Sequence, residues 1–582
     1  MGRFLARVAV AVIALGLAVW SPVTAQTARL SLPDVPNPRV IEASDVGRFG
    51  GTFVTTSISD PRTFNPIVAQ ETSSSTPLAY LFESLVETNR FTGEIEPNLA
   101  ESWTVSQDGR TWRFKLRRGV QWYDGRPVTA DDLIFTLDAA FTEGVQSSLP
   151  DVWTVAGKKI GYRKIDDLTV EFRTDQPFGP FLRSVGGLQP VPKHRLESTL
   201  RRGAADFNRS WGINTNPREL VGNGPFVMHA YVPGQRILYT RNAKYWKVDK
   251  RGQRLPYLAR IVIEIVPNVE TARLKFHARD IDMYAARPRE YAELLRRQQA
   301  ENFTIFDGPP TFGTEFLIFN QNPAGVRPPK LTWFQNVKFR QAVAHGIDRD
   351  AIVRQVYAGR ATPAWGPVSP ANRFFFNPNV RKYPYDLARA ETLLREAGFT
   401  RGADGALRDA AGNVVEFVIA TNSGNTDREA IGNLIRQDLA KLGMRVTFAP
   451  EAFNTLVGKL TGTFNWEAIV LGLTGGLEPH NGQNVWRSNG SLHMWWPRQE
   501  RPATDWEAEI DRLFDQAATT IDQNKRRQLY NRWQEIVAEQ VPVIYTATQL
   551  TQPAFRNTLA NFSAAPLAFY DLETLYYRTP YR

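Results

Sequence analysis

The chain of 582 residues contains no cysteine, so it has neither disulfide bonds nor thiolate metal sites, and it lacks the cysteine that is acylated in bacterial lipoproteins. Its six histidines are scattered, and no two stand at the helical spacing of a zinc-binding pair. No GxSxG nucleophile elbow, HExxH zinc helix or GxxxxGK(S/T) phosphate loop occurs. We therefore expect a protein that is not an enzyme and that uses no cofactor or metal.

Long hydrophobic runs are also missing. The longest run, residues 8–19, has 12 residues, whereas a membrane-spanning helix needs roughly 20. It follows Arg3 and Arg7 and precedes a small-residue sequence that ends at Ala25, which is the arrangement of a cleaved secretory signal. We expect cleavage after Ala25 and no lipid anchor. Since an exported protein without an anchor is retained only by a second membrane, we expect it in the periplasm.

Basic charge is in excess but is not gathered into blocks. Removing residues 1–25 takes away two arginines and no acid, which lowers the formal net charge from +11 to about +9. Because this charge is spread along the chain and no nucleic-acid motif occurs, we expect no nucleic-acid partner. The 557 residues that remain of 582 exceed what one core serves, since single cores stop growing near about 250–300 residues. We expect two or three lobes.

The first half of the chain is rich in strand patterns, which follow a proline-containing, extended leader at residues 26–49. Asp108-Gly109 separates two alternating runs and predicts a β-hairpin. Pro233-Gly234 predicts a turn between two further strands. Thr129 and Asp132 have the spacing of a capping box at the start of an amphipathic helix. This part of the chain is therefore predicted to be mainly β with a few helices.

Beyond Asn336 helices alternate with strands. The strand at residues 415–420, the helix at 427–442 and the strand at 444–448 form a βαβ unit, which implies parallel pairing with a right-handed crossover. A further strand, residues 467–473, is expected to join the same sheet. In open α/β sheets ligands bind outside the carboxyl ends of the strands, so that end is the expected ligand side.

Residues 465–497, which we name the glycine–tryptophan loop, contain that last strand and a long segment rich in glycine, tryptophan and amide side chains. Glycine lets the main chain approach a ligand closely, and tryptophan offers a flat apolar surface with one donor. The segment is either a recognition loop or a surface loop whose tryptophans plug a core. Its place at the carboxyl end of a strand favours recognition.

Together these patterns resemble the extracellular solute-binding proteins of ABC-type peptide importers, the oligopeptide- and dipeptide-binding family. The resemblance covers residues 51–548, and its most specific part lies between residues 81 and 125. Its motifs are Leu81-Phe82-Glu83-Ser84-Leu85, Glu96-Pro97-Asn98-Leu99-Ala100, Asp108-Gly109, Phe114-Lys115-Leu116-Arg117-Arg118-Gly119-Val120, Asp124-Gly125 and Gly222-Asn223-Gly224-Pro225-Phe226, with support from residues 337–349 and 385–399.

The resemblance implies an α/β fold: a two-lobed periplasmic binding protein clamp with mixed α/β sheets and a smaller α+β domain inserted in lobe one. In the division that it implies, lobe one combines residues 50–75, 200–310 and 541–582. The inserted domain is residues 76–199, and lobe two is residues 311–540.

The resemblance also raises a question about the ligand. In peptide-binding relatives an aspartate in the loop that corresponds to residues 472–478 commonly grips the peptide's α-ammonium group, and this chain has no aspartate there. Because a buried ammonium needs an anion, either Glu478 supplies it or the ligand has no free amine. The expected ligand-binding residues are Thr474, Gly475, Glu478, Asn484 and Trp486, with Trp365 and Phe64 from neighbouring turns; the last two are alternatively core aromatics.

We expect a protein that captures a peptide or peptide-like solute by lobe closure and delivers it, as a monomer, to an ABC-type permease in the inner membrane. The alternative ligand is an oligosaccharide or another non-peptide solute, since indole rings and amides suit the faces and hydroxyls of sugars. An exported hydrolase is the alternative from another class.

Overall fold

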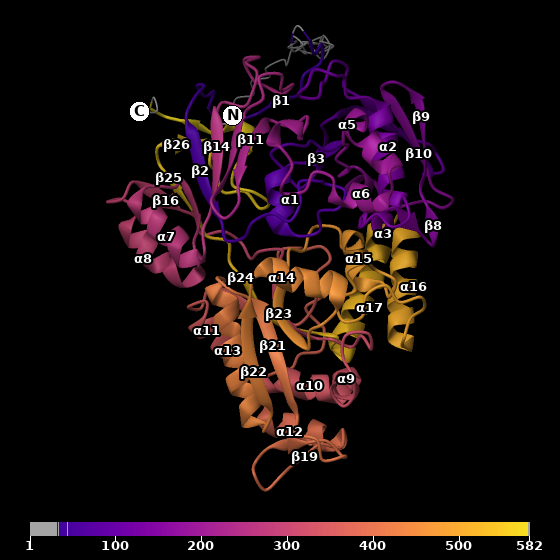
Figure 1. The fold of residues 1–582 in the computed structure, drawn as a ribbon, viewed down its shortest axis with the longest axis vertical. Coiled ribbons are helices and arrows are strands. Elements are labelled where there is room, and N and C mark those ends of the chain that lie inside the picture. Colours follow the sequence, from indigo (N-terminus) through magenta and orange to yellow (C-terminus); the bar gives the residue numbers. More distant parts are fainter. Residues whose placement is uncertain (1–31, 33, 44, 580–582) are drawn as a thin grey trace, which may run out of the picture.

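The computed structural model describes residues 32, 34–43 and 45–579, so the expected signal segment at residues 1–25 lies outside the described residues. The chain forms two bodies stacked along the long axis of the molecule, with both labelled termini in the upper one (Figure 1). Mixed α/β sheets build each body. The expected α/β, two-lobed fold is therefore confirmed.

Lobe one, in the upper body, is built on a four-stranded sheet with the order β11-β12-β14-β2. The hairpin predicted at Pro233-Gly234 joins β11 to β12, and the N-terminal β2 pairs in parallel with β14. A three-stranded sheet, β15-β25-β16, and two helices lie beside it. The elements are β2 (Thr52–Ser57), α1 (Thr72–Leu78), β11 (Phe226–Val232), β12 (Arg236–Arg241), β14 (Arg260–Ile265), α7 (Val269–Ala278), β15 (Met283–Ala285), α8 (Tyr291–Arg297), β16 (Phe303–Ile305) and β25 (Pro553–Arg556).

The inserted domain, also in the upper body, has a four-stranded antiparallel sheet with the order β5-β6-β10-β9. The hairpin predicted at Asp108-Gly109 is the β5–β6 connection. The predicted capping box is present, since the Thr129 N–H donates to the Asp132 carboxylate at 2.9 Å. The elements are β5 (Ala100–Val105), β6 (Thr111–Leu116), α2 (Ala130–Phe141), α3 (Leu149–Val152), β9 (Gly161–Asp166), β10 (Thr169–Arg173), α4 (Phe181–Val185), α5 (Lys193–Arg201) and α6 (Ala204–Arg209).

Lobe two, the lower body, is built on a six-stranded sheet with the order β18-β24-β17-β23-β21-β22. The predicted βαβ unit is β21–α13–β22, with parallel pairing, and β23 joins the same sheet beside β21. Helices cover both faces over two separate apolar cores. The elements are β17 (Thr314–Phe319), α9 (Lys330–Gln335), α10 (Val337–Gly346), α11 (Arg349–Gln355), β18 (Ala361–Pro363), α12 (Leu387–Glu396), β21 (Glu416–Asn422), α13 (Thr426–Lys441), β22 (Arg445–Glu451), α14 (Phe453–Gly458), β23 (Ala468–Leu473), α15 (Gln483–Trp486), α16 (Asp505–Thr519), α17 (Gln523–Gln540) and β24 (Val543–Gln549).

One strand lies outside the expected division of the chain. The resemblance assigns residues 541–582 to lobe one, yet β24 pairs with β17 and β18 in the sheet of lobe two. The chain returns to lobe one only at β25. The physical reason is hydrogen bonding: the interior strand β17 needs a partner on its second edge, and β24 supplies it.

Two short segments carry the chain between the lobes, and they are hydrogen-bonded to each other. The Thr551 N–H donates to the Pro309 C=O at 2.9 Å, and the Gly308 N–H donates to the Thr551 C=O at 2.8 Å. The Thr311 N–H donates to the Gln549 C=O at 2.9 Å. This narrow pair of connections has the form of a hinge.

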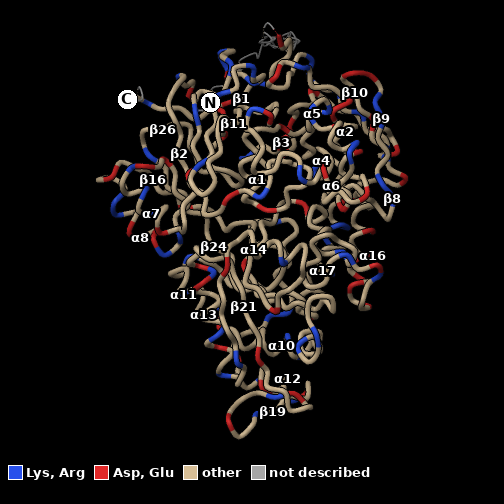
Figure 2. Tube along the Cα trace, in the orientation of Figure 1, with Lys and Arg blue, Asp and Glu red and all other residues tan. Residues whose placement is uncertain are grey.

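Charged side chains of both signs are interspersed over the molecule, as expected from the spread of charge in the sequence (Figure 2). Among the described residues, no helix combines the length and the apolar character needed to cross a bilayer.

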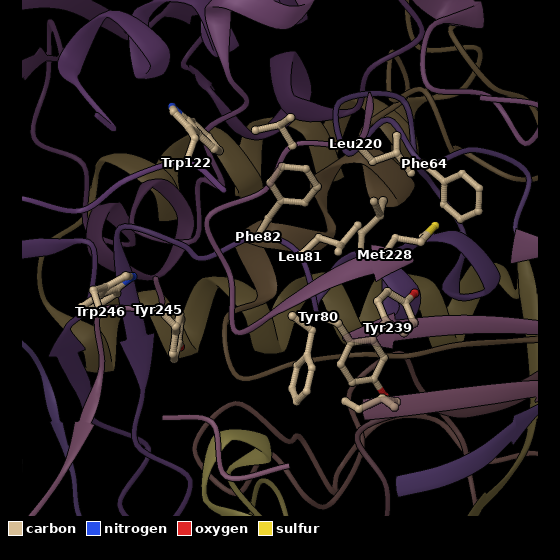
Figure 3. Packing of buried hydrophobic residues seen from close by; sticks show 14 of the residues in the cluster. Phe64, Tyr80, Leu81, Phe82, Trp122, Leu220, Met228, Tyr239, Tyr245 and Trp246 are labelled. Atoms are coloured by element: carbon tan, nitrogen blue, oxygen red, sulfur yellow. The ribbon is translucent and has the colours of Figure 1, made fainter. Parts of the chain in front are cut away.

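The Gly222-Asn223-Gly224 motif lets two segments of the main chain pack closely together in the core of lobe one. The Asn223 and Gly224 N–H groups both donate to the Leu81 C=O, at 3.0 and 2.8 Å. A Cβ atom on Gly222 would lie 2.1 Å from that oxygen, so only glycine fits. Figure 3 shows Leu81 among the large apolar side chains of this core.

Replacing Gly222 by alanine is therefore expected to lower the free energy of unfolding by about 1–3 kcal/mol, the usual cost of forcing an extra group into a packed core. Chemical denaturation followed by tryptophan fluorescence measures the change. Gly187→Ala is the matched control, since Gly187 is exposed and a Cβ atom there meets no other atom within 4 Å. Equal stabilities of the two variants would contradict the packing role.

Candidate functional site

A cavity of about 850 Å³ lies between lobe one and lobe two. From lobe one it is lined by the end of β2, by α1 and by the C-terminal segment that contains Tyr570. From lobe two it is lined by the start of β17, the end of β23 and α14. The carboxyl end of β23 thus opens into the cavity, as expected for the ligand side of an open α/β sheet. Cavities of this size bury most of the surface of a bound small molecule.

The cavity wall combines aliphatic and aromatic side chains with many hydroxyl groups. Its aromatic residues are phenylalanine and tyrosine, and its hydroxyls come from threonine and serine on both lobes. The charged residues in the wall are Glu71, Glu315 and Arg428. Throughout the described part of the chain, no group of three histidine, aspartate or glutamate side chains is placed to hold a metal ion.

Arg428 and Glu315 neutralise each other through two parallel hydrogen bonds. Nε of Arg428 lies 2.9 Å from one Glu315 carboxylate oxygen, and Nη2 lies 3.2 Å from the other. Nη1 donates to the Asn422 side chain at 2.9 Å, so all three guanidinium nitrogens are engaged. A Cβ atom on Gly472 would lie 2.7–2.8 Å from this pair, so any side chain at that position of β23 would displace the pair. The pair therefore contributes polarity but no net charge to the cavity.

Of the seven residues predicted from the sequence, Thr474 lines the cavity. The next residue, Gly475, has a φ of +64° and lies against the Phe312 C=O, outside the cavity wall. The main chain of Asn484 accepts a hydrogen bond from the Leu492 N–H at 2.9 Å, and its side chain does not belong to the wall.

The three predicted aromatic residues are core residues and lie away from the cavity wall. Phe64 is fully buried among the apolar side chains of lobe one (Figure 3). It lies edge-on to Tyr231, with ring centres 5.2 Å apart. Trp486 packs edge-on against Trp533 at 5.1 Å in one core of lobe two. Trp365 packs beside the other core, under the guanidinium of Arg349. The alternative interpretation of Phe64 and Trp365 as core aromatics agrees with these positions.

Glu478 is engaged by an arginine of its own lobe. Its carboxylate forms an ion pair with Arg526, and the two side chains are only 3% and 2% exposed. It also accepts the His480 N–H at 3.1 Å. The sequence left open whether Glu478 supplies the anion for a ligand amine; in this structure its charge is already satisfied, away from the cavity wall.

The glycine–tryptophan loop divides its residues among three roles. Trp486 and Trp495 plug a core of lobe two, which matches the plugging interpretation. Polar residues of the loop bind the inserted domain: the Ser491 hydroxyl donates to the Asp151 carboxylate at 2.7 Å, and the Ser184 hydroxyl donates to the Asn481 side chain at 2.6 Å. Residues 471–474, with Leu492, Met494 and Pro497, line the cavity, which matches the recognition interpretation.

None of the three charged residues of the cavity wall was predicted from the sequence. Glu71 lies in a polar stretch that lacks apolar periodicity, and the structure shows that the stretch continues into the short helix α1. Arg428 could have been predicted, because it stands in the first turn of α13, directly after the carboxyl end of β21, where ligands bind in open α/β sheets. Glu315 could not be predicted in this way, because nothing in the neighbouring sequence marks a strand residue that faces a cavity.

Replacing Glu478 by glutamine is expected to lower the free energy of unfolding by about 3–5 kcal/mol, because the buried charge of Arg526 loses its partner. Chemical denaturation measures this, with Glu500→Gln at an exposed position as the control. The double variant Glu478→Gln/Arg526→Met is expected to recover part of the loss. If Glu478→Gln and the control unfold at the same denaturant concentration, the ion pair does not stabilise the fold.

His480 gives the same loop a dependence on pH. The side chain is fully buried, and burial together with the positive charge of Arg526 lowers its pKa to about 3. Below about pH 6.5 the unfolded chain takes up a proton at His480 that the folded protein does not, so stability falls as the pH falls.

Between pH 6.5 and 5 this one group is expected to remove roughly 2 kcal/mol of stability, at about 1.4 kcal/mol per pH unit. Comparing denaturation curves at pH 7 and pH 5, His480→Gln should lose less stability than the wild type by about that amount. His229→Gln, at an exposed position, should follow the wild type. The same acid loss in all three proteins would exclude His480 as its source.

Known proteins are similar to this sequence over most of its length. A probable ABC transporter-binding protein of Deinococcus radiodurans is 32% identical over 525 residues, which cover 86% of this chain and 87% of that protein. Heme-binding protein A of Haemophilus influenzae is 28% identical over 85% of this chain and 87% of its own. The dipeptide-binding protein of Escherichia coli is 26% identical over 90% of this chain and 94% of its own.

The fold is shared as well. The structure of the oligopeptide-binding protein AppA from Bacillus subtilis, in complex with a nonapeptide, superposes with a TM-score of 0.79 at 24% identity, covering 92% of this chain and all of that one. The model of the family described as bacterial extracellular solute-binding proteins, family 5 middle, matches residues 94–492. These matches confirm the family resemblance inferred from the sequence motifs. The chain belongs to the bacterial extracellular solute-binding proteins of family 5.

Proposed function

We propose that this protein captures a peptide or peptide-like solute in the cavity between its lobes and delivers it to an ABC-type importer. The observation that carries the proposal is that two strand edges, one from each lobe, meet at this cavity, and that neither edge has a partner strand there among the described residues. An extended peptide pairs with such edges through main-chain hydrogen bonds, largely independently of its side chains.

The first edge belongs to β2. The Val54 N–H and C=O both bond to Asp282, at 2.7 and 2.8 Å, on the side away from β14. The Ser57 C=O accepts the Val266 N–H at 2.8 Å, on the β14 side. Since main-chain groups alternate between the two edges of a strand, Thr56 directs its N–H and C=O to the outer edge. Thr56 lines the cavity.

The second edge belongs to β23. Its parallel pairing with β21 ends at Ile469, and beyond that point the Val470 C=O accepts the Thr421 hydroxyl at 2.8 Å. By the same alternation, the main-chain groups of Gly472 and Thr474 point to this edge. Both residues line the cavity. A ligand in the cavity therefore meets main-chain donors and acceptors from each lobe.

The wall chemistry supports a peptide over a sugar. The oligosaccharide alternative rested on the indole rings and the amides of the glycine–tryptophan loop, but its tryptophans lie in the core of lobe two or outside the wall, and its amide side chains do not line the cavity. The name of the E. coli relative gives dipeptides as its ligand, whereas that of the H. influenzae relative gives heme, so membership of the family leaves the solute open.

Capture would proceed by closure about the hinge at residues 308–311 and 549–551, which encloses the ligand and strengthens each polar contact by excluding water. The proposal includes residues 76–199 as the inserted domain, a periplasmic location with the signal removed after Ala25, no lipid anchor, a monomeric state and an inner-membrane permease as partner. It is supported by the signal pattern of the sequence and by a family whose description is extracellular and solute-binding, not enzymatic.

The ligand class is tested with a thermal-shift panel of alanine- and leucine-based peptides of two to six residues, alongside raffinose and stachyose. We expect peptides to raise the melting temperature and the sugars to leave it unchanged. Mass spectrometry after prolonged incubation should recover the bound peptide intact, which a hydrolase would not allow. A response to the sugars alone would replace the peptide proposal with its alternative.

The binding mode has its own control. N-methylation of alternate peptide bonds removes main-chain donors and leaves the side chains in place. We expect it to weaken binding at least tenfold, measured by calorimetry. Equal affinity for the methylated and unmethylated peptides would rule out pairing with the two strand edges.

A further inference from the structure

The lobes also meet outside the cavity, where the start of α7 in lobe one lies against the start of α13 in lobe two. The Val269 N–H donates to the Gly424 C=O at 3.2 Å. A Cβ atom on Gly424 would lie 2.5 Å from the Pro267 C=O oxygen, so the two main chains approach closely. In Figure 1 this contact is on one side of the interface between the bodies, and the contact of α3 with α15 is on the other. Helices α1 and α14, which line the cavity, lie between the two contacts.

An ion pair crosses the contact between α7 and α13. Nη1 of Arg287, which follows β15, lies 3.2 Å from Oδ2 of Asp427 in the first turn of α13. The two side chains are 17% and 5% exposed. The main chain of Arg287 is held to lobe one, because its N–H donates to the Glu290 carboxylate at 2.9 Å. Beside the pair, Arg289 donates to the Thr426 hydroxyl at 3.1 Å. The ion pair therefore joins two elements that are each fixed in a different lobe.

This pair is buried but incompletely bonded. Neither carboxylate oxygen of Asp427, nor Nε of Arg287, has a hydrogen-bond partner in the part of the chain that the structure describes. Burial raises the pKa of the Asp427 carboxyl, and the nearby charge of Arg287 acts in the opposite direction without cancelling that effect. While the lobes are together, Asp427 depends on Arg287 for its compensation, whereas water would hydrate both groups once the lobes part.

Neither residue of the pair lines the cavity, although Asn425 and Arg428, which stand on either side of Asp427, do. The pair can therefore form without contact with a solute. We infer that Arg287 and Asp427 are a latch between the lobes, which sets the stability of the closed conformation and, through it, the affinity for any solute. They are positioning residues, since they act on binding through closure. The inference rests on the proposed function only in taking closure as the step that captures the solute.

A buried ion pair of this kind predicts a distinctive pattern in variants. Removing one partner leaves the other charge buried and uncompensated, which disfavours the closed conformation strongly. Removing both partners in favour of apolar side chains leaves no buried charge and costs little. A side chain that only fills space would not show this recovery in the double variant.

Hydrogen exchange followed by mass spectrometry tests the latch without any solute, and its reporter is the Val269 N–H that bonds across the contact. In Arg287→Met a proteolytic fragment that contains Val269 should exchange at least tenfold faster than in wild type. Arg287→Met/Asp427→Leu should return the rate to within about threefold of wild type. Arg296→Met, at an exposed position of α8, is the matched control and should exchange like wild type. Fragments of β12 should keep the wild-type rate in every variant, which separates opening of the latch from general unfolding.

Calorimetry with the tightest-binding solute of the thermal-shift panel measures the effect on capture. Arg287→Met should bind this solute at least tenfold more weakly, mainly through faster dissociation, and the double variant should recover most of the loss. Wild-type exchange at Val269 in Arg287→Met, no recovery in the double variant, or faster exchange with unchanged affinity would each overturn the latch while capture stands. If no solute of the panel binds wild type, the proposed function fails, and the exchange rates alone decide whether the latch exists.

Discussion

The buried ion pair between Glu478 and Arg526 is the interaction on which the arrangement of the loop and its neighbours depends. Neither side chain is accessible enough to be satisfied by water, so each requires the other. The pair fixes the start of the segment that carries Asn481 and Ser491, whose side chains bind the inserted domain. The carboxylate of Glu478 is therefore bound within lobe two, where it fixes the loop that contacts the inserted domain.

Because Glu478 is bound to Arg526, the cavity wall contains only a few charged side chains among the described residues. In the wall Arg428 and Glu315 neutralise each other, and Glu71 forms no ion pair with the residues that the structure describes. Its remaining polarity comes from hydroxyls and from strand edges, which are bonding partners that any extended peptide can use. The capacity to bind different side chains would then reside in the apolar wall.

The hinge relates this cavity to transport. Two short segments connect the lobes, and hydrogen bonds between residues 308–311 and 549–551 keep them together. The inserted domain contacts lobe two through the glycine–tryptophan loop, at a distance along the chain from the hinge. Any opening of the clamp has to separate those polar contacts, so Asn481 and Ser491 influence binding through the closed state. Other residues of the same loop, among them Gly472 and Thr474, line the cavity itself.

Local patterns in the sequence were sufficient for the elements and for the family. Turn residues at Asp108-Gly109 and Pro233-Gly234 fix hairpins, and the βαβ pattern at residues 415–448 fixes a parallel pair, because these depend on neighbours in the chain. Only the tertiary structure decided that β24 completes the sheet of lobe two, that Trp486 fills a core, and that Glu478 meets Arg526. Those outcomes depend on which distant group satisfies an unpaired strand edge, an apolar surface or a buried charge, and spacing along the chain carries no information about that.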